Sequence, residues 1–466
     1  MTTDSNPSNP ESHPYSSVQP TTRFINRDFS WLEFNRRVLS QSLNDAIGVL
    51  DRVKFLSIFS SNLDEFFMKR IGLLKSRHEQ SIPHSPNRPD ELPPLETLNG
   101  CYSLIRSMES QLGECLTTQL IPMLAQEGIV IGTYEQLSED VRQRVDAWFE
   151  QEVFPILTPL AVDSGHRFPF ISNLSENLGI LVEPLDPSHS SSADGPRFAR
   201  VKIPDVLPHF IRVDTLDDDA PSSPSPQTPG IYIPLDEIVI HNLGDLFPGM
   251  RIVEILPFRL TRSAAVELDD DDVVDLLEHV EEELRMRRFA DTVRIQTPPN
   301  PSARILDFLL TELKLSKEDH FTRPGPLACA DLFEIASIDR PDLRAVPWKP
   351  VRPPSLADPE SDIFATIRKH DILVHNPYES FSDSVERFIT TAAQDPDVLA
   401  IKLTLYRTSR DSPFVDSLIK AAQDGKQVAC LVELRARFDE EKNVTFARQL
   451  EAAGVHVAYG VLGLKT

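Results

Sequence analysis

Two nearly continuous apolar runs close to the end of the chain constrain its fold more than any other feature. Residues 398–405 and 428–434 consist mainly of Val, Leu, Ile and Ala, and such runs are typical of parallel strands buried on both faces of a sheet. Between them, Pro413 and Gly425 predict the first turn and the end of a helix. A second predicted helix connects the 428–434 run to a third strand at 456–461. The sequence therefore predicts a β-α-β-α-β unit.

Arginines follow the first two of these strands. Arg407 comes after the first run, and Arg435 and Arg437 come after the second. Ligands of such sheets bind at the carboxyl ends of the strands, and guanidinium groups suit bidentate contacts with phosphate. Alternation along a strand would point Arg435 and Arg437 to the same side. The alternative is that the arginines form salt bridges with Asp411 or with the acidic residues 439–441 of the following helices.

The acidic residues are unevenly distributed. The formal net charge is −24, which by itself disfavours a protein that binds a polyanion. Residues 23–79, however, contain 10 Lys and Arg against 7 Asp and Glu, and residues 398–466 contain 10 against 8. Because the local field governs anion binding, both segments could still serve a polyanionic ligand.

Cysteine usage and hydropathy indicate the compartment. The 4 cysteines are far apart and form no CxxC pair, which favours a reducing compartment and argues against a structural zinc site. No apolar run approaches the roughly 18 residues of a transmembrane helix, and the N-terminus lacks the basic and apolar regions of a secretory signal. The sequence therefore predicts a cytoplasmic protein.

The N-terminal part is expected to be helical. Residues 1–22 are rich in Ser, Pro, Thr and Asn and are expected to form a disordered tail, whereas residues 23–127 show helical periodicity. Ser30 and Asn62 each precede a glutamate three residues later, a pattern that predicts an N-cap. Capping alone would explain Asn62. A helix beginning there could also present free N–H groups to a nucleotide.

The middle of the chain, residues 128–340, mixes strand-like and helical patterns and is expected to form a second, α/β domain. Its strand-like runs are residues 178–182, 198–203 and 231–233. Four acids at 269–272 lack the ligand spacing and central glycine of an EF-hand. They instead predict the start of a helix that ends with arginines at 285–288, as the helix dipole favours. A third, incomplete domain would cover residues 341–466.

Established catalytic motifs are missing from the sequence. It contains no P-loop, no protein-kinase motif set, no GxSxG and no HExxH. His375 and His456 lie near the C-terminal unit but have no evident partner, and both are interpreted as structural. Phosphoryl transfer by this chain would therefore not use a P-loop.

Several long motifs resemble a known family. They occur in the order of that family and are Phe29–Leu39, Phe55–Phe66, Leu399–Arg407, Val432–Glu441, Glu451–His456 and Gly463–Lys465. The chain is similar in these segments to bacterial polyphosphate kinases of the phosphohistidine type. The resemblance implies an α+β multidomain fold, with an N-terminal helical domain, a mixed α/β head domain and phospholipase D-like C-terminal domains.

The resemblance also implies an activity and its partners. The family transfers the terminal phosphate of ATP reversibly to inorganic polyphosphate, with Mg²⁺ as cofactor and a histidine as the phosphorylated intermediate. ATP, ADP and polyphosphate are therefore the expected ligands, and a homo-oligomer without nucleic acid is the expected assembly. The expected location is cytoplasmic, with peripheral attachment to the inner membrane as the alternative.

The family's site residues can be carried over to matching positions. Asn62 would contact the nucleotide, and Arg407 and Arg437 would lie at the phosphate and Mg²⁺ site, where they grip phosphates that the metal also touches. Arg435 is a possible further phosphate contact. The family's nucleophilic histidine would be the residue after Thr466, so the chain is expected to be truncated at its active site and inactive alone. Its open sheet is expected to favour aggregation.

Two other functions are compatible with the sequence. One is a phospholipase D-like phosphodiesterase, which would share the α/β core and the histidine chemistry. The other is a non-catalytic protein, or fragment, that binds ATP or polyphosphate. The helical domain with Asn62 argues against the phosphodiesterase.

Overall fold

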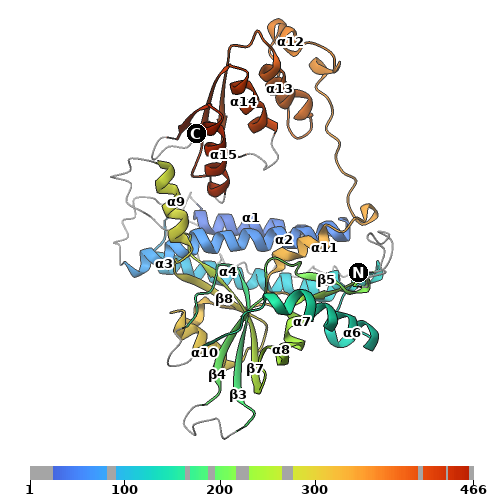
Figure 1. Cartoon of the computed structure of the whole chain (residues 1–466), viewed down its shortest axis with the longest axis vertical. Helices are drawn as coiled ribbons and strands as arrows, with labels where there is room; N and C mark the ends of the chain where they lie inside the picture. The colour runs from blue at the N-terminus through green and yellow to red at the C-terminus, as the bar shows by residue number, and fades with distance from the viewer. Residues whose placement is uncertain are drawn as a thin grey trace, which may run out of the picture. The chain divides into compact units, whose positions relative to one another are not determined.

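The computed structural model describes residues 25–80, 91–162, 168–186, 195–216, 230–264, 276–407, 413–436 and 439–460. The chain forms two compact units (Figure 1). The first consists of Met1–Ala265 with Ala290–Ala345, and the second consists of Val266–Phe289 with Val346–Thr466. No helix among the described residues combines the length and the apolar composition that a membrane span requires.

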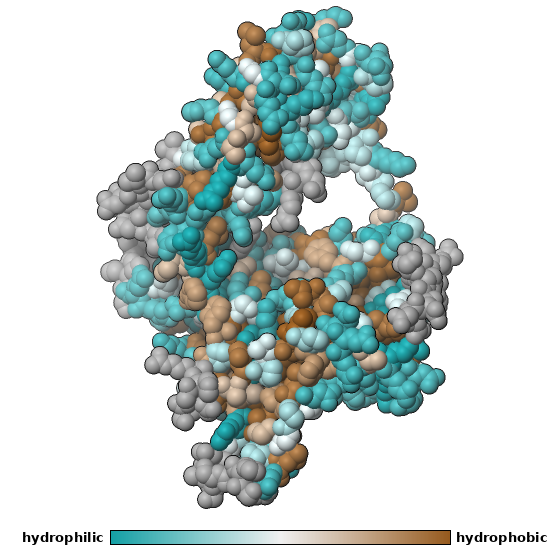
Figure 2. All heavy atoms as spheres, viewed as in Figure 1, coloured by the Kyte–Doolittle hydropathy of each residue, from teal (hydrophilic) through white to brown (hydrophobic). Residues whose placement is uncertain are grey.

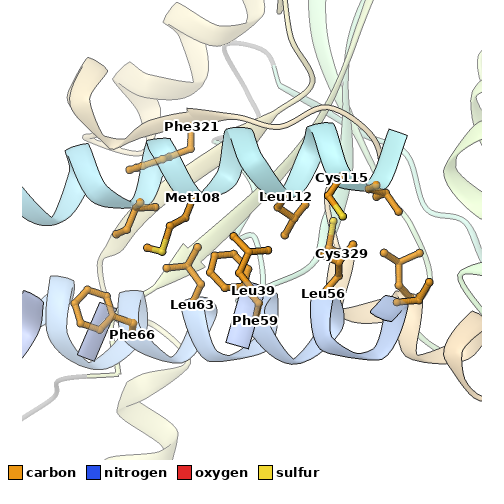
Figure 3. Packing of buried hydrophobic residues seen from close by; sticks show 14 of the residues in the cluster. Leu39, Leu56, Phe59, Leu63, Phe66, Met108, Leu112, Cys115, Phe321 and Cys329 are labelled. Atoms are coloured by element: carbon orange, nitrogen blue, oxygen red, sulfur yellow. The ribbon is translucent and has the colours of Figure 1, made fainter. Parts of the chain in front are cut away.

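The first unit begins with a helical layer. Its helices are α1 (Arg27–Ser42), α2 (Val49–Phe66), α3 (Gly72–Glu79), α4 (Pro94–Glu114) and α5 (Ile121–Gln126). Two π-helical turns, Phe67–Ile71 and Cys115–Leu120, join α2 to α3 and α4 to α5. Figure 3 shows that Leu56, Phe59 and Leu63 of α2 point toward Met108, Leu112 and Cys115, which lie on α4 and at the start of the turn after it. These side chains are essentially inaccessible to water, and their burial holds the layer together.

Both N-caps predicted for this layer are wrong. Helix α1 begins at Arg27, where the side chain of Asn26 accepts hydrogen bonds from the backbone N–H groups of Asp28 and Phe29. Ser30 therefore lies inside the first turn. Asn62 lies in the last third of α2, which runs without a break. The apolar residues of α2 recur at helical spacing on both sides of Asn62, and this continuous buried face outweighs the local capping pattern.

The rest of the first unit is built on two sheets. The larger has the order β2-β4-β3-β7-β8-β9 and is antiparallel except for β8 with β9; the smaller has the order β1-β6-β5. The strands are β1 (Ile129–Ile131), β2 (Leu160–Val162), β3 (Glu176–Pro184), β4 (Arg197–Lys202), β5 (Phe210–Arg212), β6 (Gly230–Pro234), β7 (Met250–Arg262), β8 (Thr292–Thr297) and β9 (His320–Thr322). The helices are α6 (Glu139–Trp148), α7 (Leu235–His241), α8 (Leu243–Leu246), α10 (Ala303–Glu312) and α11 (Leu332–Ala336). The three strand-like runs predicted here are confirmed as β3, β4 and β6.

The second unit contains the predicted β-α-β-α-β segment. Three parallel strands, in the order β10-β11-β12, alternate with α14 and α15. Their bounds are β10 (Ala400–Leu405), α14 (Pro413–Gln423), β11 (Gln427–Val432), α15 (Glu440–Ala452) and β12 (His456–Tyr459). Gly425 and Gly454 follow the two helices with φ of +84° each, the left-handed conformation that ends a helix at a glycine. Helices α9 (Leu276–Arg287), α12 (Ile363–Lys369) and α13 (Arg387–Gln394) complete the described part of the unit.

The prediction that these strands are buried on both faces is wrong. Leu403, Cys430 and Val457 lie on the face that packs with α14 and α15 in one core. On the other face, Lys402 and His456 are exposed and Ala429 between them is partly exposed. Successive right-handed crossovers that advance in one direction place their helices on the same face, and the order β10-β11-β12 does not reverse. The expected aggregation through this open sheet stays a prediction.

Helix α9 belongs to the second unit, although the sequence analysis placed it in the middle domain. Leu277 and Val280 are buried in the core that α14 and α15 share. An ion pair between Glu281 and Arg448 of α15, 2.7 Å long, adds a polar contact. The acids predicted to open this helix, at 269–272, lie outside the described residues. Figure 2 shows a mainly hydrophilic surface on this unit in the view chosen.

Candidate phosphate-binding site

The carboxyl ends of β10 and β11 form one edge in the second unit. The backbone N–H of Glu433 donates to the carbonyl of Leu405 and extends the ladder by one residue. The buried amide of Asn443 on α15 then donates to two carbonyls, that of Tyr406 at 2.9 Å and that of Glu433 at 2.8 Å. One side chain thus holds together the two loops from which Arg407 and Arg435 extend.

Arg407 lies two residues after the end of β10 and is more accessible than Arg435. Its side chain is 54% exposed, and its Nε lies 2.9 Å from Oδ2 of Asp439. The salt-bridge alternative from the sequence is therefore realised in the ligand-free chain. An exposed pair of this kind contributes only ~0.2–1 kcal/mol, so a phosphate with several negative charges can compete with the carboxylate.

Arg435 lies in a turn rather than on a strand. β11 ends at Val432, so strand alternation does not determine where Arg435 points, and that part of the argument is wrong. Its backbone N–H donates to Oε1 of Glu433, and its Nη2 lies 3.5 Å from Oε1 of Glu283 on α9. Arg437, the second arginine of this loop, lies outside the described residues.

Further positively charged side chains lie around this edge, and each is paired with a carboxylate. Arg287 of α9 pairs with Glu440 at the start of α15 at 2.8 Å, and Lys442 lies 4.0 Å from Asp439. Each described cation at the edge therefore faces a carboxylate. This network balances the charges at the edge in the absence of ligand. It also offers a set of guanidinium groups that a phosphate chain can take over from the carboxylates.

The side chains at this edge differ in whether they can bind Mg²⁺. Guanidinium groups carry a positive charge and present only donors, so neither Arg407 nor Arg435 can ligate Mg²⁺. The carboxylate of Asp439 beside Arg407 is an oxygen donor of the kind that Mg²⁺ takes, and Mg²⁺ usually also binds the substrate's phosphates. The residues fit a metal that enters with a phosphate ligand.

Asn62 belongs to the first unit, whereas Arg407 and Arg435 belong to the second. Its Nδ2 donates to Oδ1 of Asn35 at 3.0 Å, and Nδ2 of Asn35 donates to the carbonyl of Phe59 at 3.1 Å. The carbonyl can only accept, so the Asn35 amide must present nitrogen to it and oxygen to Asn62. Asn62 must therefore turn its nitrogen toward Asn35, which leaves its Oδ1 directed elsewhere.

This geometry changes what Asn62 can do. Because it lies inside α2, no free backbone N–H groups surround it, and the idea that a helix N-terminus there binds a nucleotide is wrong. The half-buried side chain instead offers an oriented carbonyl oxygen, to which none of the described residues donates a hydrogen bond. An exocyclic amino group of a base is a suitable donor for such an oxygen. Trp31 stacks on Phe66 near this position, with ring centroids 4.8 Å apart.

A buried ionic network lies two residues further along α2. Asp64 binds Arg259 of β7, with Nη2 2.7 Å from Oδ2, and also Arg294 of β8. Arg323 binds Glu109 of α4 at 2.7 Å. Burial would raise the pKa of Asp64, but the charges and hydrogen bonds of Arg259 and Arg294 hold it well below its usual value. The network fixes the part of α2 that carries Asn62 against the larger sheet.

Two positioning residues, Asn35 and Asn443, were not predicted from the sequence. Both are fully or nearly buried polar residues within helices, where an asparagine needs partners. A buried asparagine on the apolar face of a predicted helix is the signal that could have identified them. His375 and His456 are both exposed, as their interpretation as structural residues allows.

Comparison with known proteins agrees with this architecture. Family models for the N-terminal domain, the middle domain and C-terminal domain 1 of polyphosphate kinase match residues 24–132, 140–335 and 362–466. Curated polyphosphate kinases of Mycolicibacterium gilvum and a Synechocystis species are 44% and 45% identical over 96% and 95% of this chain. The crystal structure of polyphosphate kinase from Porphyromonas gingivalis matches with a TM-score of 0.74 and 25% identity over 96% of this chain.

The chain belongs to the polyphosphate kinase family. It spans about three fifths of the relatives it matches, since the alignments cover 60% and 62% of the two curated proteins and 60% of the crystallised chain. The fold class expected from the sequence, α+β with several domains, is confirmed.

Proposed function

We propose that this protein is an ATP:polyphosphate phosphotransferase, which transfers the γ-phosphate of ATP reversibly to polyphosphate through a phosphohistidine. The observation that supports the proposal is that Asn443 holds together the two loops that carry Arg407 and Arg435, at the carboxyl edge of β10 and β11. The matches to the N-terminal and middle domains of polyphosphate kinase favour it over a phosphodiesterase.

The site residues would have different roles. Arg407, with Arg435 and Arg437, would bind phosphate oxygens and stabilise the charge that develops on the transferred group. Asp439 would supply an oxygen ligand to Mg²⁺ bound together with the nucleotide, and the ion would supply positive charge against the phosphates. Asn62 would accept a hydrogen bond from the base. A reducing cytoplasmic location and a homo-oligomeric state are part of the same proposal.

Residues 1–466 do not include the proposed nucleophile, which the resemblance places directly after Thr466. A protein made of these residues alone is therefore proposed to bind ATP and polyphosphate without becoming phosphorylated. With the following residues present, incubation with γ-labelled ATP should label the protein on a histidine. Phosphate should then pass from that histidine to polyphosphate.

Labelling of both forms tests the proposal. Label should appear only when the residues after Thr466 are present, and Arg407→Ala should reduce its rate by ~100-fold or more, the usual effect of removing a transition-state donor. Arg285→Ala is the matched control, because Arg285 is 73% exposed in the same unit and pairs only with Glu282 of its own helix among the contacts described. Label on residues 1–466 that is lost in His456→Gln or His375→Gln would contradict the assignment.

A further inference from the structure

Three side chains of the first unit converge on one point. They are Glu176 at the start of β3, His209 just before β5, and Asp331 just before α11. One ligand atom from each lies within 4.8 Å of the other two. Nδ1 of His209 is 3.5 Å from Oε2 of Glu176 and 3.1 Å from Oδ2 of Asp331. These residues come from segments far apart in the sequence.

Outer contacts orient this cluster. The carboxylate of Glu334 accepts hydrogen bonds from the backbone N–H groups of His209 and Phe210, at 3.0 and 2.9 Å. Oε1 of Glu176 accepts from the backbone N–H of Ala328 at 2.8 Å, so that Oε2 is the atom turned toward the imidazole. Ligating groups in metal sites are typically held by such second contacts.

A histidine paired with two carboxylates is the simpler interpretation, but it leaves one contact poorly satisfied. The two carboxylate oxygens approach the same ring nitrogen, and a ring nitrogen carries at most one proton. That proton can form one well-aligned hydrogen bond, not two. A divalent ion at the centre would bind all three atoms at once.

We propose that Glu176, His209 and Asp331 bind a transition-metal dication, best matched by Zn²⁺. Zn²⁺ takes one imidazole nitrogen and carboxylate oxygens at about 2.0–2.2 Å, which places neighbouring ligand atoms roughly 3.3 Å apart. The separations from Nδ1 of His209 to the two carboxylate oxygens, 3.1 and 3.5 Å, lie on either side of this value. The imidazole nitrogen favours Zn²⁺ over Mg²⁺ and Ca²⁺, which prefer oxygen ligands only. Three protein ligands leave one position for water.

Such an ion would join three parts of the first unit. It would tie the larger sheet through Glu176 to the smaller sheet through His209, and both to α11 through Asp331. Leu332 and Ile335 of α11 pack in the same core as α2, so the ion would stabilise the contact of both sheets with the helical layer. This role is separate from phosphate binding in the second unit.

Calorimetric titration of the untagged, chelator-treated chain with Zn²⁺ tests the proposal. One ion per chain should bind, and His209→Gln and Asp331→Asn should each weaken binding by ~10-fold or more, as expected for loss of a ligand. His370→Gln, which removes an exposed histidine of the second unit, is the control and should bind as the original chain does. Mg²⁺ at the same concentrations should not compete.

Two additional measurements keep the test decisive. Co²⁺ bound in place of Zn²⁺ should give the visible absorption of a four-coordinate site, and this absorption should be absent in Glu176→Gln. The melting temperature should rise with Zn²⁺ in the original chain and in His370→Gln but not in the ligand variants, whose folding is checked by circular dichroism. A folded chain that binds no Zn²⁺, or variants that bind it unchanged, would overturn the proposal and leave an ion-paired histidine.

Discussion

The two units hold their arginines in opposite ways. In the first unit, the side chains of Arg259, Arg294 and Arg323 are at most 4% exposed and share two buried carboxylates. In the second unit, the side chains of Arg407 and Arg435 are 54% and 28% exposed. Arg407 pairs with Asp439, whose side chain is 29% exposed, and Arg435 pairs with the largely buried Glu283. The same residue type therefore occurs in two different electrostatic environments.

Burial determines what each set of arginines can do. A buried guanidinium that loses its partner is left without solvation, at a cost of several kcal/mol, so the first network cannot exchange its carboxylates for a ligand. Burial even lowers the pKa of Arg294 to about 10. An exposed pair is weak enough to open. The comparison assigns a structural role to the first set and a ligand-binding role to the second.

The largest expected effect is a loss of stability, and it tests the structural role assigned to the buried arginines. Asp64→Asn should destabilise the chain by ~3–5 kcal/mol, because it leaves Arg259 and Arg294 buried without their shared charge. Chemical denaturation measures this loss. Asp205→Asn removes an exposed carboxylate that pairs with Lys202 and should leave the denaturation midpoint unchanged. Equal midpoints for the two variants would contradict the distinction.

The pH dependence of stability sharpens the same point. The folded-state pKa of Asp64 lies below its ordinary value of 3.8 because Arg259 and Arg294 outweigh the effect of burial. Its contribution is therefore fully present above that value and is lost as the pH falls toward the folded-state pKa. Asp64→Asn should show a shallower loss of stability below about pH 4 than the original chain. A parallel loss in both would contradict the assignment.

The next largest effect is expected at Asn443, which holds the two loops that carry the exposed arginines. Asn443→Ala leaves the carbonyls of Tyr406 and Glu433 without their shared donor, and we expect a loss of ~1–3 kcal/mol in stability. Polyphosphate affinity should also fall, since the two loops are no longer tied together. Thr445→Ala, on the exposed side of the same helix, is the control for both measurements. Unchanged affinity with lowered stability would show that Asn443 does not position the arginines.

Asn62 provides a smaller effect in the first unit. Asn62→Ala should weaken ATP binding by ~10-fold, the value of about one hydrogen bond. Asn62→Asp keeps an acceptor but brings a negative charge against Oδ1 of Asn35, so it should bind no better than Asn62→Ala. Calorimetric titration with ATP measures both. Asn62→Asp binding like the original chain would exclude the orientation by Asn35.

The comparison also separates what the sequence could predict from what it could not. The β-α-β-α-β segment follows from local signals, namely apolar runs, a proline in the first helical turn and glycines after helices, and it is confirmed. Local signals do not predict that one face of this sheet is exposed. Whether helices cover one face or both depends on the direction in which successive strands are added to the sheet. The caps at Ser30 and Asn62 failed because local capping patterns recur inside helices, where a continuous apolar face decides the outcome.

The candidate site shows the same division. The carboxyl-edge rule correctly placed Arg407 and Arg435 on loops that follow two neighbouring strands. It could not supply Asn443 or Glu283, because their approach depends on how α15 and α9 pack onto the sheet. The buried network was equally hidden, since Asp64 and its partners Arg259 and Arg294 are separated by 195 and 230 positions. Long-range polar partners require tertiary packing, which no local pattern encodes.

The smallest expected effect is the most direct test of the exposed pair. A double-mutant cycle on Arg407 and Asp439 should give a coupling free energy of only ~0.2–1 kcal/mol for stability. Asp439→Asn should at the same time raise affinity for polyphosphate in the absence of Mg²⁺, because the carboxylate no longer competes for the guanidinium. The gain should shrink as salt is added, since the Debye length falls to about 8 Å at physiological ionic strength. A coupling of several kcal/mol, or weaker polyphosphate binding by Asp439→Asn without Mg²⁺, would mean that this pair is structural like the network of Asp64.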